Sequence, residues 1–173
     1  MVTEGNAEVG ECLPQALATA LRSRNWRLAT AESCTGGLIA AACTELAGSS
    51  DWFERGFVTY SNASKTELLG VDPSLIQAHG AVSQEVAAAM VRGALARAPV
   101  QLAVAVTGIA GPGGAVPGKP VGTVWLGWGC VGAIQTELLQ LPGDRASVRQ
   151  ATVAAALRRL VAVARAAPAR PPA

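Results

Sequence analysis

The stretch Thr30-Ala31-Glu32-Ser33-Cys34-Thr35-Gly36-Gly37 is the polar turn around which the rest of the chain is organised. Residues 26–29 before it predict the start of a short buried strand, and the apolar run 38–43 predicts the first turns of a helix. A polar turn between a strand and a helix places its hydroxyl groups at the carboxyl edge of a sheet, near the free N–H groups of the helix. Such a turn could hold a nucleophile or an anion, or it could be an ordinary Ser/Thr cap followed by glycines.

The length and composition predict a single layered domain. The 173 residues suffice for one sizeable core. Half of them are hydrophobic but only 4% are aromatic, so the core must consist of closely packed Ala, Val, Leu and Ile. We expect the domain to span residues 9–166, with a disordered lead-in over 1–8 and a tail rich in Pro and Ala over 167–173.

Net charge and cysteine spacing argue against several classes of partner. Fourteen Lys and Arg against twelve Asp and Glu give a net charge of +2, far from the basic excess of a nucleic-acid-binding protein. The four cysteines form no CxxC pair and there is one histidine, so we expect no metal site. No apolar run approaches the ~20 residues of a membrane span, and the N-terminal glutamates are opposite in sign to a secretory signal. We therefore expect a cytoplasmic protein with reduced thiols.

Strand and helix patterns alternate along the chain. Residues near 26–29, 53–60, 100–106, 123–128 and 134–141 favour strands. Helices are expected at about 9–24, 38–47, 64–69, 73–79, 84–95 and 146–164. The last two strands are separated by a short turn and predict an antiparallel hairpin. The fold class is therefore a three-layer α/β/α sandwich with a mixed, mostly parallel sheet of about five strands.

Three of the predicted strands end in polar segments that contain glycine or lysine, at 32–37, 60–65 and 107–114. Ligands bind at the carboxyl ends of the strands in sheets of this kind. The convergence of three polar segments on one edge favours a functional site over simple turn chemistry.

Lysine is scarce, since only Lys65 and Lys119 occur among the fourteen basic residues. A partly desolvated lysine amine can lose its proton near neutral pH whereas a guanidinium cannot, so a site that needs a base requires lysine. Ser33 could attack a substrate while neutral Lys65 takes its proton, although both lysines could also be solvated charges. Cys34 is the rival nucleophile, with a packed, inert thiol as its alternative. The only imidazole, His79, is predicted to end a helix.

The segment 108–119 contains five glycines and two prolines, a composition that lets backbone N–H groups approach an anion. Thr107, Gly108 and Gly111 at its start are candidate substrate contacts. Arg145 and Arg149 lie one helical turn apart and could both donate to a phosphate, or they could be solvated helix charges.

Seven segments resemble, in order, the competence/damage-inducible CinA C-terminal domain family. They are AESCTGG (31–37), GSS (48–50), FVTYSN (57–62), HGAVS (79–83), TGIAGP (107–112), KPVGTV (119–124) and GDR (143–145). The similarity runs from about residue 10 to about residue 165. Some members of this family are domains of longer proteins, whereas this chain is similar to the stand-alone enzymes.

The resemblance implies an activity, because the enzymatic members of the family are nicotinamide mononucleotide deamidases. They hydrolyse the carboxamide to nicotinate mononucleotide and ammonia without a metal or cofactor. Ser33 would then be the nucleophile and Lys65 its base, with Tyr60 and Asn62 orienting the amide. The N–H groups of Thr35, Gly36 and Gly37 would stabilise the oxyanion.

Other functions stay open at this point. The chain could be a nucleotide-binding regulatory domain that has the pocket without the turnover, or it could hydrolyse a different amide. If the chain is a deamidase, its partner is a small-molecule nucleotide substrate, and we expect it to bind neither nucleic acid nor a membrane. We also expect a homo-oligomer, a dimer or larger.

Overall fold

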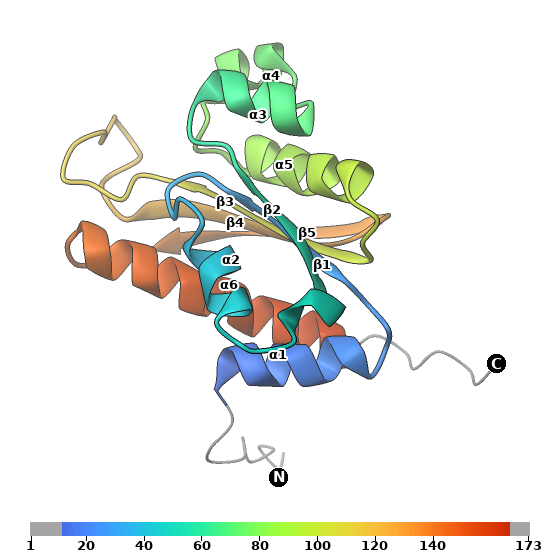
Figure 1. The fold of residues 1–173 in the computed structure, drawn as a ribbon. Helices are drawn as coiled ribbons and strands as arrows, with labels where there is room; N and C mark the ends of the chain where they lie inside the picture. Colours follow the sequence, from blue (N-terminus) through green and yellow to red (C-terminus); the bar gives the residue numbers. More distant parts are fainter. Residues whose placement is uncertain (1–11, 167–173) are drawn as a thin grey trace, which may run out of the picture.

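A five-stranded sheet with the order β2-β1-β3-β4-β5 forms the centre of the computed structural model, which describes residues 12–166 (Figure 1). The strands are β1 (Leu28–Glu32), β2 (Phe53–Val58), β3 (Leu102–Gly108), β4 (Thr123–Cys130) and β5 (Ala133–Gln140). β1 pairs in parallel with both β2 and β3, whereas β4 is antiparallel to β3 and to β5. The mixed sheet and its hairpin are confirmed, although the expectation of a mostly parallel sheet describes only the first three strands.

Helices cover both faces of this sheet, so the three-layer fold is confirmed (Figure 1). One layer holds α1 (Leu13–Arg22), α2 (Leu38–Thr44) and α6 (Arg145–Ala166), and the other holds α3 (Asn62–Leu69), α4 (Pro73–His79) and α5 (Gln84–Arg97). A 3₁₀ turn, η1 (Ser49–Asp51), leads into β2.

The predicted boundaries are confirmed at two helix ends. His79 is the last residue of α4, and the Asp144 carboxylate accepts a hydrogen bond from the Ser147 N–H at 2.8 Å at the start of α6. The lead-in expected over 1–8 and the tail expected over 167–173 lie outside the described residues.

The two faces of the sheet bury different kinds of side chain. Leu28 and Leu102 belong to the larger apolar cluster under α1 and α6. The face under α5 is lined by small residues, which are Ala29, Ala31, Ala103 and Ala105. Small side chains let a helix approach the sheet closely, and a Cβ at Gly127 of β4 would lie 3.0 Å from the Ala87 carbonyl oxygen of α5. Within residues 12–166, no helix is long and apolar enough to cross a membrane.

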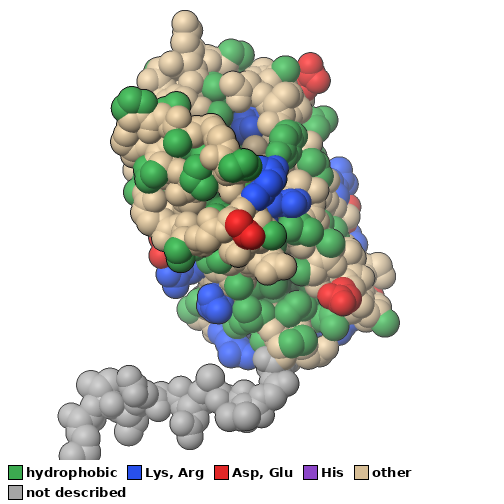
Figure 2. Space-filling view, turned by 90° about the vertical axis from the view of Figure 1, so that its left-hand side faces the viewer, with side chains coloured by type: hydrophobic (Ala, Val, Ile, Leu, Met, Phe, Trp, Pro, Cys, Tyr) green, Lys and Arg blue, Asp and Glu red, His purple; other side chains and the backbone are tan. Residues whose placement is uncertain are grey.

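The parallel pairing places the carboxyl ends of β2, β1 and β3 at one edge of the sheet. The polar segments that follow these strands therefore meet there, as the sequence indicated. Figure 2 views the molecule from the side of the β3–β4 loop and the start of α6, and it shows Lys and Arg side chains near the middle of that face with an acidic side chain beside them. This edge of the sheet is therefore the candidate position of a functional site.

We expect Gly93→Ala to destabilise the protein, because a Cβ at Gly93 of α5 would overlap the carbonyl oxygen of Leu69 at the end of α3. Overpacking of this kind costs about 1–3 kcal/mol, which for a chain of this size lowers Tm by roughly 2–12 °C. Gly113→Ala is the matched control, since a Cβ there would have no atom within 4 Å. Thermal unfolding of both variants is the measurement, and equal Tm values would contradict the close contact.

Candidate active site

Ser33 and Lys65 face one another at the carboxyl edge of the sheet. Ser33 directly follows β1, is 9% exposed, and its N–H donates to the Val106 carbonyl of β3 at 3.1 Å. Lys65 is 1% exposed, and its Nζ lies 3.1 Å from Ser33 Oγ. The same Nζ donates to the Thr59 carbonyl at 2.9 Å. A hydroxyl and an amine at this separation can exchange a proton directly.

Local sequence explains why α3 delivers Lys65 to this point. Ser61 and Ser64 form a capping box, in which each side chain accepts a hydrogen bond from the backbone N–H of the other, at 3.0 and 3.1 Å. The box fixes the first turn of α3 directly after β2. Lys65 follows in that turn and points inward.

Burial lowers the pKa of Lys65 below the ordinary lysine value of 10.5, because desolvation disfavours the ammonium. The Cys34 thiol opposes this shift only as a smaller effect. A neutral amine has two N–H donors and one lone pair. In the structure Nζ donates to both the Thr59 carbonyl and Ser33 Oγ, and when the amine is neutral its lone pair can instead accept the Ser33 proton.

Cys34 lies in a different environment from Ser33. It is 6% exposed and packs in the apolar cluster that also contains Ile39 and Cys43. Burial raises the pKa of the Cys34 thiol to about 11, so the thiolate is scarce at neutral pH. These surroundings match the packed, unreactive thiol that was the alternative to a catalytic one.

Glu32 is a polar residue of this edge to which sequence reasoning gave no role. Its side chain is buried, and Oε2 accepts hydrogen bonds from Thr35 Oγ1 at 2.7 Å, Gly37 N–H at 3.1 Å and Ile39 N–H at 3.0 Å. Oε1 accepts from the Ala40 N–H at 2.8 Å. The carboxylate thus caps α2, whose N-cap residue Gly37 has no side chain. A charged residue inside a buried strand was the signal available in the sequence.

The N–H groups of Gly36 and Gly37, which were expected to donate to an oxyanion, have partners within the turn in this structure. Gly36 donates to the Ser33 carbonyl at 3.0 Å, and Gly37 donates to Glu32. Both glycines have positive φ, +61° and +103°, which directs these N–H groups back into the turn. Thr35 donates its hydroxyl to Glu32, and the role of its N–H as a donor to the oxyanion stays a prediction. These residues shape the turn that carries Ser33.

The two arginines at the start of α6 contact the polar strand ends. Arg145 donates through Nη1 to the Gly111 carbonyl at 2.8 Å and through Nη2 to the Tyr60 hydroxyl at 2.7 Å. Arg149 donates through Nη2 to the Thr35 carbonyl at 3.0 Å, and its buried Nε has no partner among the described residues. The structure therefore brings Tyr60, Gly111 and both arginines to the edge that holds Ser33.

Three further residues from the sequence analysis, Thr107, Gly108 and Lys119, make contacts with other parts of the fold. Thr107 donates its hydroxyl to the Ala81 carbonyl at 2.8 Å, and Gly108 packs against Val124 of β4. Lys119 donates to the carbonyls of His79 and Val82, at 3.1 and 2.7 Å, and so ties the glycine-rich loop to the end of α4.

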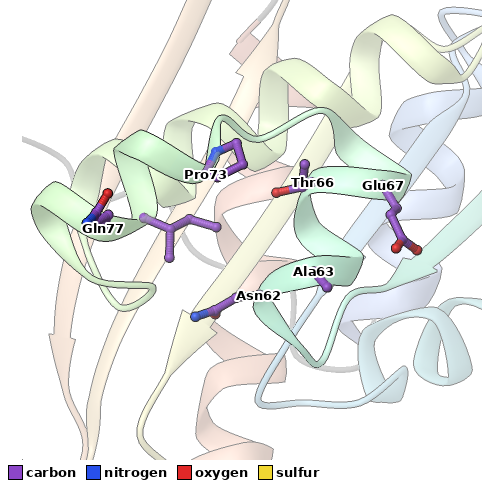
Figure 3. A pocket seen from close by; sticks show the side chains of 7 residues that line it. Asn62, Ala63, Thr66, Glu67, Pro73 and Gln77 are labelled. Atoms are coloured by element: carbon purple, nitrogen blue, oxygen red, sulfur yellow. The ribbon is translucent and has the colours of Figure 1, made fainter.

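Asn62 lines a groove between α3 and α4 whose volume is about 490 Å³ (Figure 3). In the close-up its side chain points away from α3 and into the groove. Among residues 12–166, no group of three or more His, Cys, Asp and Glu side chains could hold a metal ion.

The model of the CinA C-terminal domain family matches residues 11–164. The chain belongs to the CinA C-terminal domain family. Its CinA-family relatives include the nicotinamide-nucleotide amidohydrolase PncC of Pseudomonas putida, 58% identical over 79% of this chain and 86% of that protein. PncC of Enterobacter agglomerans is 54% identical over 77% of this chain and 82% of its own length. The crystal structure of the competence/damage inducible protein CihA from Agrobacterium tumefaciens matches with a TM-score of 0.85 and 45% identity, covering 87% of this chain and 93% of that chain.

Proposed function

We propose that the chain is an amidohydrolase that converts nicotinamide mononucleotide to nicotinate mononucleotide and ammonia, with Ser33 as nucleophile and Lys65 as base. The single observation that carries this proposal is the buried contact of 3.1 Å between Lys65 Nζ and Ser33 Oγ. Two relatives over 50% identical are named for nicotinamide-nucleotide amidohydrolase activity, which supports the choice of substrate. A domain that only binds a nucleotide would have no use for this pair.

In the proposed reaction, Ser33 Oγ attacks the carboxamide carbon while Lys65 takes the hydroxyl proton. The tetrahedral intermediate then expels ammonia, whose third proton comes from Lys65. The resulting ester is hydrolysed by a water that gives its proton to the same amine, and Ser33 is regenerated. One amide and one water thus become one carboxylic acid and one ammonia.

Tyr60 supports the proposal as a donor to the substrate amide. Its hydroxyl accepts a hydrogen bond from Arg145, which leaves its own proton free to donate. The side chain is 59% exposed at the edge of the site, so a ligand can reach it.

The cellular setting that we propose is cytoplasmic salvage of pyridine nucleotides by a homo-oligomer.

Incubation of the purified protein with nicotinamide mononucleotide should release ammonia, and Ser33→Ala should abolish the release because it removes only the attacking oxygen. Cys34→Ala is the matched control on the neighbouring residue and should retain most of the activity. Calorimetry of Ser33→Ala with the substrate separates the two functions, since binding should survive. Binding by the wild-type protein without ammonia release would favour a regulatory domain. Full activity in Ser33→Ala with loss in Cys34→Ala would transfer the role to the thiol.

Lys65→Arg should reduce kcat/KM by about 10²–10⁴-fold, the range that a general base contributes, because arginine retains the charge but not the basicity. Lys119→Arg is the control at the only other lysine and should remain near wild type. For the wild-type protein, kcat/KM should rise with pH as Lys65 loses its proton and level off above its pKa, which burial places below 10.5. Activity that persists in Lys65→Arg, with the same pH profile, would contradict the role of base.

Arg145→Ala or Arg149→Ala should weaken use of the nucleotide if the side chain holds the 5′-phosphate. Loss of a charge-assisted hydrogen bond costs about 1.5–3 kcal/mol, or roughly 10–100-fold in kcat/KM at ~1.4 kcal/mol per decade. Nicotinamide riboside lacks the phosphate, so its kcat/KM should be equally poor in the variant and the wild type. Measurement of both substrates in both proteins forms a double-mutant cycle. An equal loss for both substrates would mean that the arginine only holds Tyr60, Gly111 or Thr35 in place.

A further inference from the structure

Glu32 is a buried charged residue that the proposed reaction does not use. It lies at the end of β1, which is paired on both sides by β2 and β3, and 1% of its surface is exposed. Burial of a carboxylate is costly unless hydrogen bonds compensate it, and Glu32 receives four. All four donors lie within the next eight residues of the chain, so the carboxylate organises its own downstream segment.

The hydrogen bonds of the Glu32 side chain hold the backbone next to Ser33, the proposed nucleophile. Ser33 stands between β1, which is fixed by its sheet partners, and the turn whose Thr35 hydroxyl and Gly37 N–H both bond to Glu32 Oε2. The N–H groups of Ile39 and Ala40 attach the start of α2 to the same carboxylate. The path of the backbone on the C-terminal side of Ser33 is therefore fixed by the Glu32 side chain.

The backbone carbonyl of Glu32 is connected through Thr59 to Lys65, the proposed base. The backbone carbonyl of Glu32 accepts a hydrogen bond from the Thr59 N–H at 2.8 Å. The carbonyl of Thr59 in turn accepts from Lys65 Nζ at 2.9 Å. The acceptor that orients the lysine amine is thus attached to the same residue whose side chain holds the turn of Ser33.

We infer that Glu32 is a positioning residue for the Ser33–Lys65 pair, since its carboxylate holds the turn that carries Ser33 and its carbonyl holds Thr59, to which Lys65 is bonded. This inference rests on the proposed function of the pair. Glu32 itself touches neither the reacting atoms nor the substrate. Its effect is to keep two groups from different layers of the fold at the separation that proton transfer requires.

A displacement of about 1 Å in a catalytic group can cost on the order of 10²-fold in rate. Glu32→Gln should therefore lower kcat by roughly 10–100-fold with little change in KM. An amide can replace only one carboxylate oxygen as an acceptor, and its NH₂ group would face an N–H donor of α2.

Thr35 provides the sharper pair of variants. Thr35→Val removes the hydroxyl donor to Glu32 but retains the shape of the side chain, and it should lower kcat about 10-fold. Thr35→Ser restores the hydroxyl and should return kcat to within about 3-fold of wild type. Leu17→Ala, a change to the apolar core in α1 that removes none of the Glu32 hydrogen bonds, lowers stability and should leave kcat per folded molecule unchanged.

A second readout does not depend on the amide substrate. Phenylmethanesulfonyl fluoride reacts with an activated serine, forming a bond from Ser33 Oγ to sulfur and releasing fluoride while Lys65 takes the proton. Mass spectrometry should show labelling of Ser33 in the wild type and Thr35→Ser, and slower labelling in Glu32→Gln and Thr35→Val. Wild-type labelling without amide turnover would contradict the proposed substrate and leave the role of Glu32 measurable.

The inference is overturned if Glu32→Gln and Thr35→Val lower Tm as Leu17→Ala does while kcat and the labelling rate per folded molecule stay at the wild-type value. In that case Glu32 is a helix cap and no more. It is also overturned if wild-type Ser33 neither turns over the nucleotide nor reacts with the sulfonyl fluoride, since there is then no reactive pair to position.

Discussion

The parallel pairing of β1 with both of its neighbours is the constraint on which the site depends. In this register Glu32 lies opposite Val58, the last residue of β2, and opposite Val106 of β3, which continues for two more residues to Gly108. The segments that follow β1, β2 and β3 therefore lie close to one another at this edge of the sheet. The N–H of Ser33 bonds to β3 and the N–H of Thr59 bonds to β1, which continues the ladder one residue past the strand ends. Ser33, and Thr59 to which Lys65 is bonded, are thus hydrogen-bonded to the sheet although they lie just beyond the ends of β1 and β2.

The two helical layers contribute unequal parts to this edge. α3 belongs to the layer of α5 and supplies Lys65, whereas α6 belongs to the opposite layer and supplies Arg145 and Arg149. Ser33 lies at the boundary between the layers. α3 can take this position because α5 presents Gly93 to its last residue, which allows the two backbones to approach closely. A glycine inside a helix is costly, and here its benefit is the placement of a neighbouring helix.

Local chemistry explains what could be predicted from the sequence. Hydrophobic periodicity located the helices and strands, and polar strand ends located Ser33 and Lys65, because both signals depend on residues close together in the chain. The partners of Arg145 could not be predicted, since Tyr60 lies 85 residues away and Gly111 lies 34 residues away. The glycines of the turn were visible, but the direction of their N–H groups depends on positive φ angles and on the carboxylate of Glu32. The position of Glu32 in a buried strand was visible in the sequence, but the N–H groups of α2 that it accepts were not.

The order in which these parts are synthesised follows from the position of α6. A ribosome makes Ser33 and Lys65 in the first half of the chain, and domains generally fold as units once their sequence has emerged. Arg145 and Arg149 come near the end of the chain, and α6 also covers much of the larger apolar cluster. A nascent or prematurely terminated chain therefore contains Ser33 and Lys65 but neither the two arginine side chains nor the closed core. Only the synthesis of α6 brings Arg145 and Arg149 to the sheet edge beside Gly111 and Thr35.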